Sequence, residues 1–241
     1  GLSQTGIYTT AFYIGMIIEI PRRAISQISI PFISENIKNQ NINKVEDYYK
    51  EISLHQTLIG VLFYLLVIIN LDHIFNLIPN SENFISGKDV VYVIGFCKLI
   101  IMFFSFNSEI ISLSKYYRFT VVTIIILALI SIALNLILIP IYGMIGAAFA
   151  SLISILIFNI IKHVFIILKM KISPFSINTL KVILIGITLF TIDNYLMPSI
   201  SNDFLAILLK STVTIVLYLS VIYLLKISPK LNDMIKSFIK N

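Results

Sequence analysis

The sequence predicts an all-α protein: a polytopic transmembrane bundle of about seven spanning helices. Its 241 residues have a mean hydropathy of +0.95, with 58% hydrophobic and only 12% charged side chains, outside the range of soluble globular domains. The apolar residues gather in seven segments, each close to the roughly 20 residues that a helix needs to cross a bilayer. These segments are 7–33, 52–71, 89–113, 119–140, 144–168, 177–197 and 204–226.

The first segment carries charges well inside an apolar run, where Glu19, Arg22 and Arg23 surround Pro21. Each charge at bilayer depth costs at least about 2.5–3.5 kcal/mol on insertion scales, so three together need a partner or a wet cavity. Glu19 lies three and four residues before the arginines, which places opposite charges on one helix face. Pro21 is expected to bend the helix, and two guanidiniums suit a ligand with phosphate oxygens. Alternatively, Glu19 neutralises one arginine and locks the bundle, which leaves the other unpaired.

The connection 34–51 follows the first segment and is rich in lysine. Its Val45, Tyr48 and Tyr49, together with Ile52, recur at helical spacing. This pattern predicts a short helix lying on the cytoplasmic membrane surface. A plain solvated loop is the alternative.

The third segment carries a polar stripe. At 100° per residue, Lys98, Ser105 and Glu109 fall within about 40° of one another on a continuous helix, and such a stripe faces a cavity or another polar helix rather than lipid. Lys98 and Glu109 lie roughly 16 Å apart along the axis, too far to pair directly. Glu109 lies near the cytoplasmic end, so pairing with Lys115 or Arg118 is its structural alternative.

The fourth and fifth segments are predicted to form a tight antiparallel hairpin. Pro140 is expected to end the first helix because it lacks an N–H, and Gly143 can adopt the positive φ of a sharp reversal. Gly146 opens a stretch of small residues that lets two helix backbones approach closely. Asn135, late in the fourth segment, is expected to hydrogen-bond across helices.

The last two segments look peripheral and lipid-facing. We therefore expect a membrane-embedded bundle over 1–168, and two peripheral helices with a tail over 169–241. Basic residues occur only in every second connection between segments, and the positive-inside rule then places the tail in the cytoplasm and Gly1 outside. The connections without Lys or Arg are 72–87, 140–143 and 193–203.

The motif from Asn135 to Ser151, NLILIPIYGMIGAAFAS, carries a resemblance to a known family. With the SKYYR motif upstream and the opening Gly6-Ile7-Tyr8 that leads to Pro21 and Pro31, the chain resembles the C-terminal half of polysaccharide-exporting flippases. These are the O-antigen-flippase-like members of the multidrug/oligosaccharidyl-lipid/polysaccharide exporter superfamily. The resemblance implies a fourteen-helix protein with both termini cytoplasmic, of which this chain supplies helices eight to fourteen. Because the chain begins at a glycine rather than at methionine, we expect it to be a fragment that lacks its N-terminal lobe.

The resemblance also implies a function and a site. The function is alternating-access flipping of an undecaprenyl-diphosphate-linked oligosaccharide across the bacterial inner membrane, for surface polysaccharide such as O-antigen lipopolysaccharide, with H⁺ or Na⁺ as a possible coupling ion. Residues at membrane depth fit a pathway for the anionic head group, and the alternatives are a drug/cation antiporter and a non-transporting membrane scaffold. The candidate pathway residues are Glu19, Arg22, Arg23, Lys98, Ser105 and Glu109.

Enzymatic chemistry finds no support in the sequence. It contains no phosphate-binding glycine loop, no His/Cys ligand set and no candidate Ser-His-Asp triad, so we expect no enzyme, no metal and no cofactor. The single cysteine, Cys97, can form no internal disulfide. The formal net charge of +6 is spread between apolar segments rather than over one face, which argues against a nucleic-acid partner.

Overall fold

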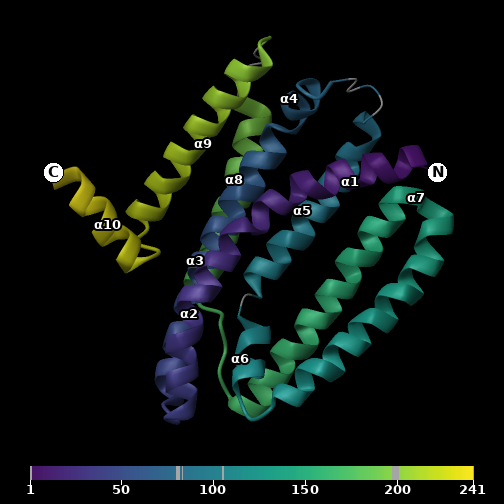
Figure 1. Cartoon of the computed structure of the whole chain (residues 1–241). Coiled ribbons are helices and arrows are strands. Elements are labelled where there is room, and N and C mark those ends of the chain that lie inside the picture. The colour runs from purple at the N-terminus through teal and green to yellow at the C-terminus, as the bar shows by residue number, and fades with distance from the viewer. Residues whose placement is uncertain (1, 80–81, 83, 105, 197–200, 241) are drawn as a thin grey trace.

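The computed structural model describes residues 2–79, 82, 84–104, 106–196 and 201–240. Every regular element in these ranges is a helix, which confirms the all-α prediction (Figure 1). The elements are α1 (Leu2–Met16), η1 (Ile17–Glu19), α2 (Ile20–Lys38), α3 (Ile42–Ile69), α4 (Leu71–Asn76), η3 (Ile85–Gly87), α5 (Lys88–Phe103), α6 (Asn107–Leu113), α7 (Tyr117–Met170), α8 (Ile177–Leu196), α9 (Asp203–Leu224) and α10 (Pro229–Lys240).

Several of these helices have the length and composition of membrane spans. Within the described ranges, α3, α7 and α9 are each long and apolar enough to cross a membrane. The helical stretches 85–103 and 107–113 meet at a bend of 42°. Together they are long and apolar enough to form one broken span or a re-entrant loop. The structure is thus that of an all-helical protein with three or four apolar helices suited to a bilayer.

The first predicted segment consists of two helices rather than one. A single turn of 3-10 helix, η1, separates α1 from α2, and Pro21 follows in the first turn of α2. Proline fits there because the N–H groups in the first turn of a helix have no acceptor within that helix, so the missing N–H of proline costs no hydrogen bond. The helix type therefore changes just before Pro21, and Figure 1 shows α1 and α2 running in different directions on either side of this turn.

The predicted interfacial helix at 34–51 is not a separate element. Residues 34–38 complete α2, Gln40 makes the turn with φ +57°, and the remainder forms the first part of α3. The predicted helical spacing of these residues is present in α3, but their apolar face packs inward rather than against a membrane surface. Val45 and Tyr49 are fully buried in a core cluster with Ile33. The physical reason is that α2 and α6 offer an apolar surface closer than the membrane.

The fourth and fifth segments form the hairpin α7, whose two arms run antiparallel in Figure 1. The reversal is at Gly143, with φ +59° and ψ −131°. Pro140 lies inside the first arm, so the prediction that it ends the helix is wrong. Apolar spans tolerate an internal proline when neighbouring groups can satisfy the carbonyl that it frees. A Cβ on Gly146 would lie 2.1 Å from the carbonyl oxygen of Leu138, so the arms approach as closely as the small residues suggested.

Asn135 does not bridge two helices as expected. Its Nδ2 donates to the carbonyl oxygen of Ser131 at 2.7 Å, one turn earlier in the same arm. The reason lies in the hairpin's orientation: the second arm faces the bundle and the first arm lies outside it. All the buried residues of α7 except Thr123 belong to the second arm. The buried residues are Thr123, Gly146, Ala148, Ala150, Ser154, Asn159, Lys162 and Ile166.

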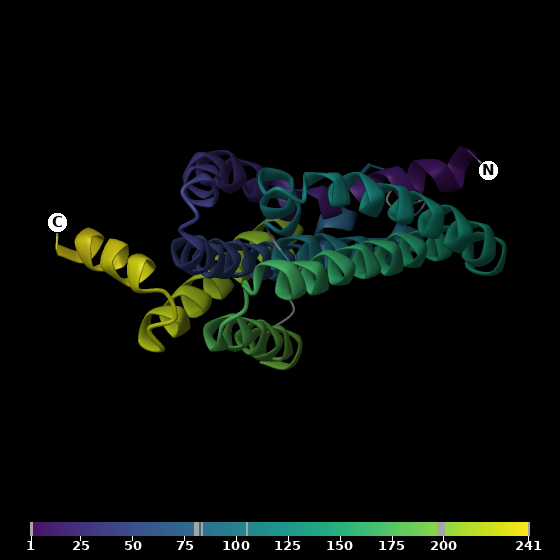
Figure 2. The same cartoon turned by 90° about the horizontal axis from the view of Figure 1, so that it is seen from below.

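The last two long helices each have one buried and one exposed face. Val182 and Ile185 of α8 pack in a core cluster with α3, whereas Leu184 and Ile187 are exposed. The hydroxyl of Tyr218 on α9 donates to the carbonyl oxygen of Leu58 on α3 at 2.7 Å. Figure 2 shows the chain extended between the α7 hairpin at one end and α10 at the other.

Candidate functional site

Four of the six candidate pathway residues form a chain of ion pairs where η1 and the start of α2 meet α5 and α6. Lys98 Nζ lies 2.7 Å from Glu19 Oε2. The other carboxylate oxygen of Glu19 lies 3.7 Å from Arg22 Nη1, and Arg22 Nη2 lies 2.9 Å from Glu109 Oε1. Cations and carboxylates therefore alternate from Lys98 to Glu109, and the four charges sum to zero.

The turn η1 positions the centre of this chain. Glu19 ends the 3-10 turn and Arg22 stands in the first turn of α2, so the two side chains leave the backbone on one side. Lys98 approaches from α5, and its ammonium also lies 5.2 Å from the centre of the Phe12 ring on α1. A positive charge over an aromatic face gains about 0.5–2 kcal/mol. Lys98 is thus held by α1 and η1 together.

The predicted polar stripe on a continuous third helix is not present. α5 ends at Phe103 and α6 starts at Asn107, with a 42° bend between the two stretches. Lys98 and Glu109 consequently belong to different helices and have different partners; Ser105 lies outside the described residues. Glu109 pairs with Arg22 rather than with Lys115 or Arg118, because the bend turns α6 toward α2.

Lys162, on the second arm of α7, joins the cluster from the other side. It is only 1% exposed, its Nζ donates to Ser108 Oγ, and the ammonium lies 3.3 Å from the centre of the Phe158 ring. Glu109 and Arg22 both act on it electrostatically. A lysine within the apolar segment 144–168 is the sequence signal that points to Lys162, but the sequence alone does not distinguish a cavity from a helix contact for this side chain.

Three buried polar atoms of this region have no hydrogen-bond partner among the described residues: Arg22 Nε, Glu109 Oε2 and Ser26 Oγ. Ser26 stands one turn after Arg22 on the same face of α2. A buried polar group without a partner costs about 1–3 kcal/mol. The cluster thus retains unused hydrogen-bonding capacity next to its charges.

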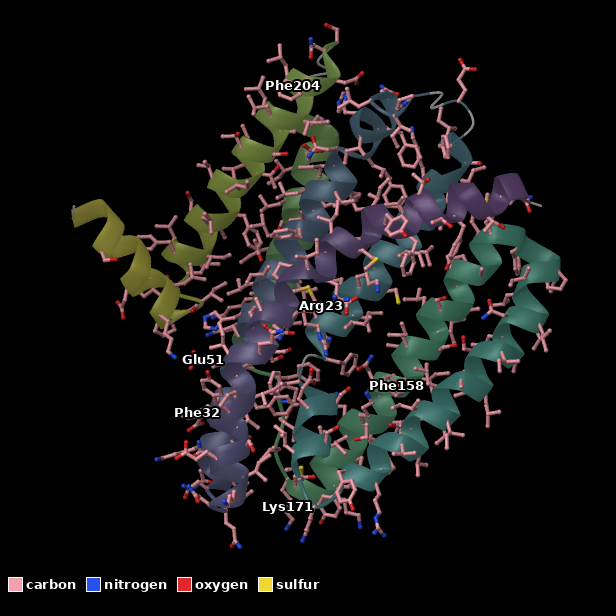
Figure 3. The ribbon with its side chains drawn as sticks, in the orientation of Figure 1. Arg23, Phe32, Glu51, Phe158, Lys171 and Phe204 are labelled. Carbon is pink, nitrogen blue, oxygen red and sulfur yellow. The ribbon has the colours of Figure 1, made fainter. Side chains whose placement is uncertain are left out.

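Arg23 is the exposed member of the group. No ion pair within the described ranges involves it. Figure 3 places it near mid-height of the long helices, on the inner side of α2. Counted together with Arg23 and Lys162, this region of the structure holds four basic side chains and two carboxylates, and only Lys98 and Arg22 are paired with the carboxylates.

A separate apolar cavity of about 670 Å³ lies among α3, α5, the second arm of α7 and α8. Aromatic side chains form much of its wall, and no charged residue lines it. This cavity suits a hydrocarbon or an aromatic group, because burial of apolar surface supplies most of the binding free energy in a pocket with such a lining. The aromatic lining residues are Tyr64, Tyr92, Phe96, Phe103, Phe104 and Phe190.

No group of three or more potential metal-ligating side chains occurs within the described ranges. Comparison with protein-family models, with curated proteins and with solved structures finds no match to this chain.

Proposed function

We propose that this chain is the C-terminal lobe of a transporter that flips an undecaprenyl-diphosphate-linked oligosaccharide across a bacterial inner membrane by alternating access. The observation that supports this proposal is the surplus of basic side chains around Arg22: within the described ranges, neither Arg23 nor Lys162 has a carboxylate within ion-pair distance. Uncompensated positive charge at membrane depth is costly, and a diphosphate supplies the missing counter-charge. Guanidinium groups match phosphate oxygens in both charge and geometry.

In this proposal the helices make seven crossings. The bent unit of α1, η1 and α2 is the first, α3 the second and the bent pair α5/α6 the third; the two arms of α7, α8 and α9 complete the set. The ion pairs from Lys98 to Glu109 join the first and third crossings at the bend of each. The cluster thus sits at the 3-10 turn of the first crossing and near the bend of the third, where the helix geometry of each changes.

The cationic residues have different roles in this mechanism. Glu19 and Glu109 already neutralise Lys98 and Arg22, so these pairs position the site and keep it folded in the absence of substrate. Arg23 is exposed and unpaired within the described ranges, so it makes the first contact with the diphosphate. The free Nε of Arg22 can then donate to a phosphate oxygen without loss of its bond to Glu109.

A drug/cation antiporter is the second candidate, and one observation favours it. The aromatic cavity of about 670 Å³ could hold a lipophilic cation through stacking and cation–π contacts. However, its wall carries no carboxylate, and the charged cluster is cationic overall. The balance of charge therefore favours an anionic substrate, and a non-transporting scaffold would leave exposed Arg23 without a role.

The test replaces Arg23 with Gln in the full-length protein and measures surface polysaccharide in a flippase-null strain. Arg118→Gln is the matched control, since Arg118 is also exposed but lies at the start of α7. We expect normal membrane levels of both variants and loss of surface polysaccharide only with Arg23→Gln. Full complementation by Arg23→Gln would overturn the assigned role. Drug resistance conferred by the wild type, without complementation, would favour the antiporter.

A further inference from the structure

The connection between α9 and α10 is a rigid corner at the end of a membrane-span candidate. After α9 ends at Leu224, Ile227 N donates to the carbonyl oxygen of Ile222 at 3.2 Å, and Lys226 N donates to that of Tyr223 at 3.2 Å. These two bonds form a Schellman motif, in which Lys226 takes the left-handed position with φ +50°. The chain therefore leaves α9 along one defined direction.

Three contacts hold this corner against the bundle. Asn178 Nδ2 on α8 donates to the carbonyl oxygen of Ile227 at 2.9 Å. The ring of His55 on α3 lies 3.0 Å from Ser228 Oγ. Lys230 Nζ, in the first turn of α10, lies 2.5 Å from Glu51 Oε1 on α3. The corner is thus preorganised by α3 and α8 rather than by α9 alone.

This corner encloses a half-open cavity of about 360 Å³, within the range that holds a small ligand. It carries one charge of each sign, from Lys226 and Asp233, and neither forms an ion pair within the described ranges. Asn232 also lines it and is only 8% exposed. Its Nδ2 donates to the carbonyl oxygen of Tyr223 at 3.1 Å, whereas its buried Oδ1 has no partner among the described residues. The remaining lining residues are Tyr223, Leu224 and Pro229.

The cavity lies where an apolar helix surface ends. Leu224 is 74% exposed and Leu225 is 52% exposed, immediately before Lys226. Exposed leucines at the end of a span contact acyl chains, and a lysine at that level reaches the lipid phosphates. A ligand of this corner therefore meets apolar surface on one side, and one positive and one negative side chain on the other.

We propose that this corner binds the head group of phosphatidylethanolamine. The ammonium of Lys226 contacts the lipid phosphate, while the primary ammonium of the ethanolamine donates to Asp233 and to the free Oδ1 of Asn232 after a small side-chain rotation. Phosphatidylcholine has no N–H to donate, and phosphatidylglycerol has no cation for Asp233. The proposal concerns the corner alone and does not depend on the transport function.

Native mass spectrometry of the purified full-length protein, exposed to equimolar phosphatidylethanolamine, phosphatidylcholine and phosphatidylglycerol, tests this site. We expect the wild type to retain phosphatidylethanolamine over either competitor by roughly two- to fivefold, as about one exposed charge-assisted contact would give. Lys226→Gln and Asp233→Asn should each abolish this preference. Both residues are exposed, so folding should be unaffected, and an unchanged size-exclusion profile will confirm it.

Lys171→Gln is the matched control. Lys171 is an exposed lysine that also ends a helix in the left-handed conformation, with φ +59°, but it lines neither cavity described above. It should keep the wild-type preference. Equal retention of the three lipids by the wild type, unchanged preference in the Lys226 and Asp233 variants, or loss of preference in Lys171→Gln would each overturn the site. Selective retention of phosphatidylglycerol would replace it with simple attraction of anionic lipid.

Discussion

Arg22 Nη2 and Glu109 Oε1 lie 2.9 Å apart and join α2 to α6 across 87 positions of sequence. Both side chains are mostly buried, with 21% and 17% of their surface exposed. An ion pair in such a place need not stabilise the fold relative to apolar residues, but removal of one partner leaves the other charge uncompensated. The packing of α6 against the bundle therefore depends on this ion pair with α2.

Glu109→Gln should destabilise the protein by about 1–3 kcal/mol, because Arg22 loses its closer charged partner in a partly buried site and keeps only Glu19, at 3.7 Å. The double variant Arg22→Met/Glu109→Leu should recover most of this loss. Thermal unfolding of the purified protein in detergent measures both. The matched control is Glu46→Gln, whose partner Lys50 lies 2.8 Å away. The side chains of this pair are more exposed, at 29% for Glu46 and 39% for Lys50, so the change should cost at most about 0.5 kcal/mol. A double variant as unstable as Glu109→Gln would contradict the pairing argument.

Gly146→Ala should destabilise the α7 hairpin. The added Cβ would meet the carbonyl oxygen of Leu138 at 2.1 Å, and backbone atoms cannot move aside as a flexible side chain can. Overpacking of this kind costs about 1–3 kcal/mol. Gly6→Ala is the control, since a Cβ on Gly6 meets nothing within 4 Å. Fluorescence-detected size exclusion after heating reads the difference, and equal midpoints for the two variants would show that the arms are not in close contact.

The orientation of the helices can be tested by cysteine labelling. Cys97→Ser removes the only thiol, after which single cysteines are placed at Glu82 and at Lys171. The distribution of lysines between alternate connections predicts that an impermeant reagent added outside whole cells reaches position 82 and not 171. Labelling of position 171 from outside would invert the topology. Permeabilised cells, in which both positions should react, provide the control.

Local features of this fold could be predicted from sequence, and long-range ones could not. The positive φ at Gly143 follows from a property of glycine itself, and the close approach at Gly146 from its lack of a side chain. Pro140 was misinterpreted because a proline inside a helix and a proline at its end look alike without knowledge of the neighbouring arm. The partner of Glu109 depends on a bend between α5 and α6 that periodicity cannot reveal.

Lys162→Met separates stability from function at the cluster. The amino group of Lys162 is fully buried and contacts one hydroxyl acceptor, Ser108 Oγ, and the face of Phe158. No carboxylate of the described residues lies within ion-pair distance of it. Methionine has a similar shape and carries no desolvation cost, so we expect an unchanged or higher midpoint of thermal unfolding. A lysine kept for a role in substrate transport should then be missed only in transport, as loss of surface polysaccharide in the flippase-null strain. Lys169→Met, two turns later on the same arm and exposed, should leave both measurements unchanged. A large fall in the unfolding midpoint of Lys162→Met would instead make the lysine part of the contact between α7 and α6.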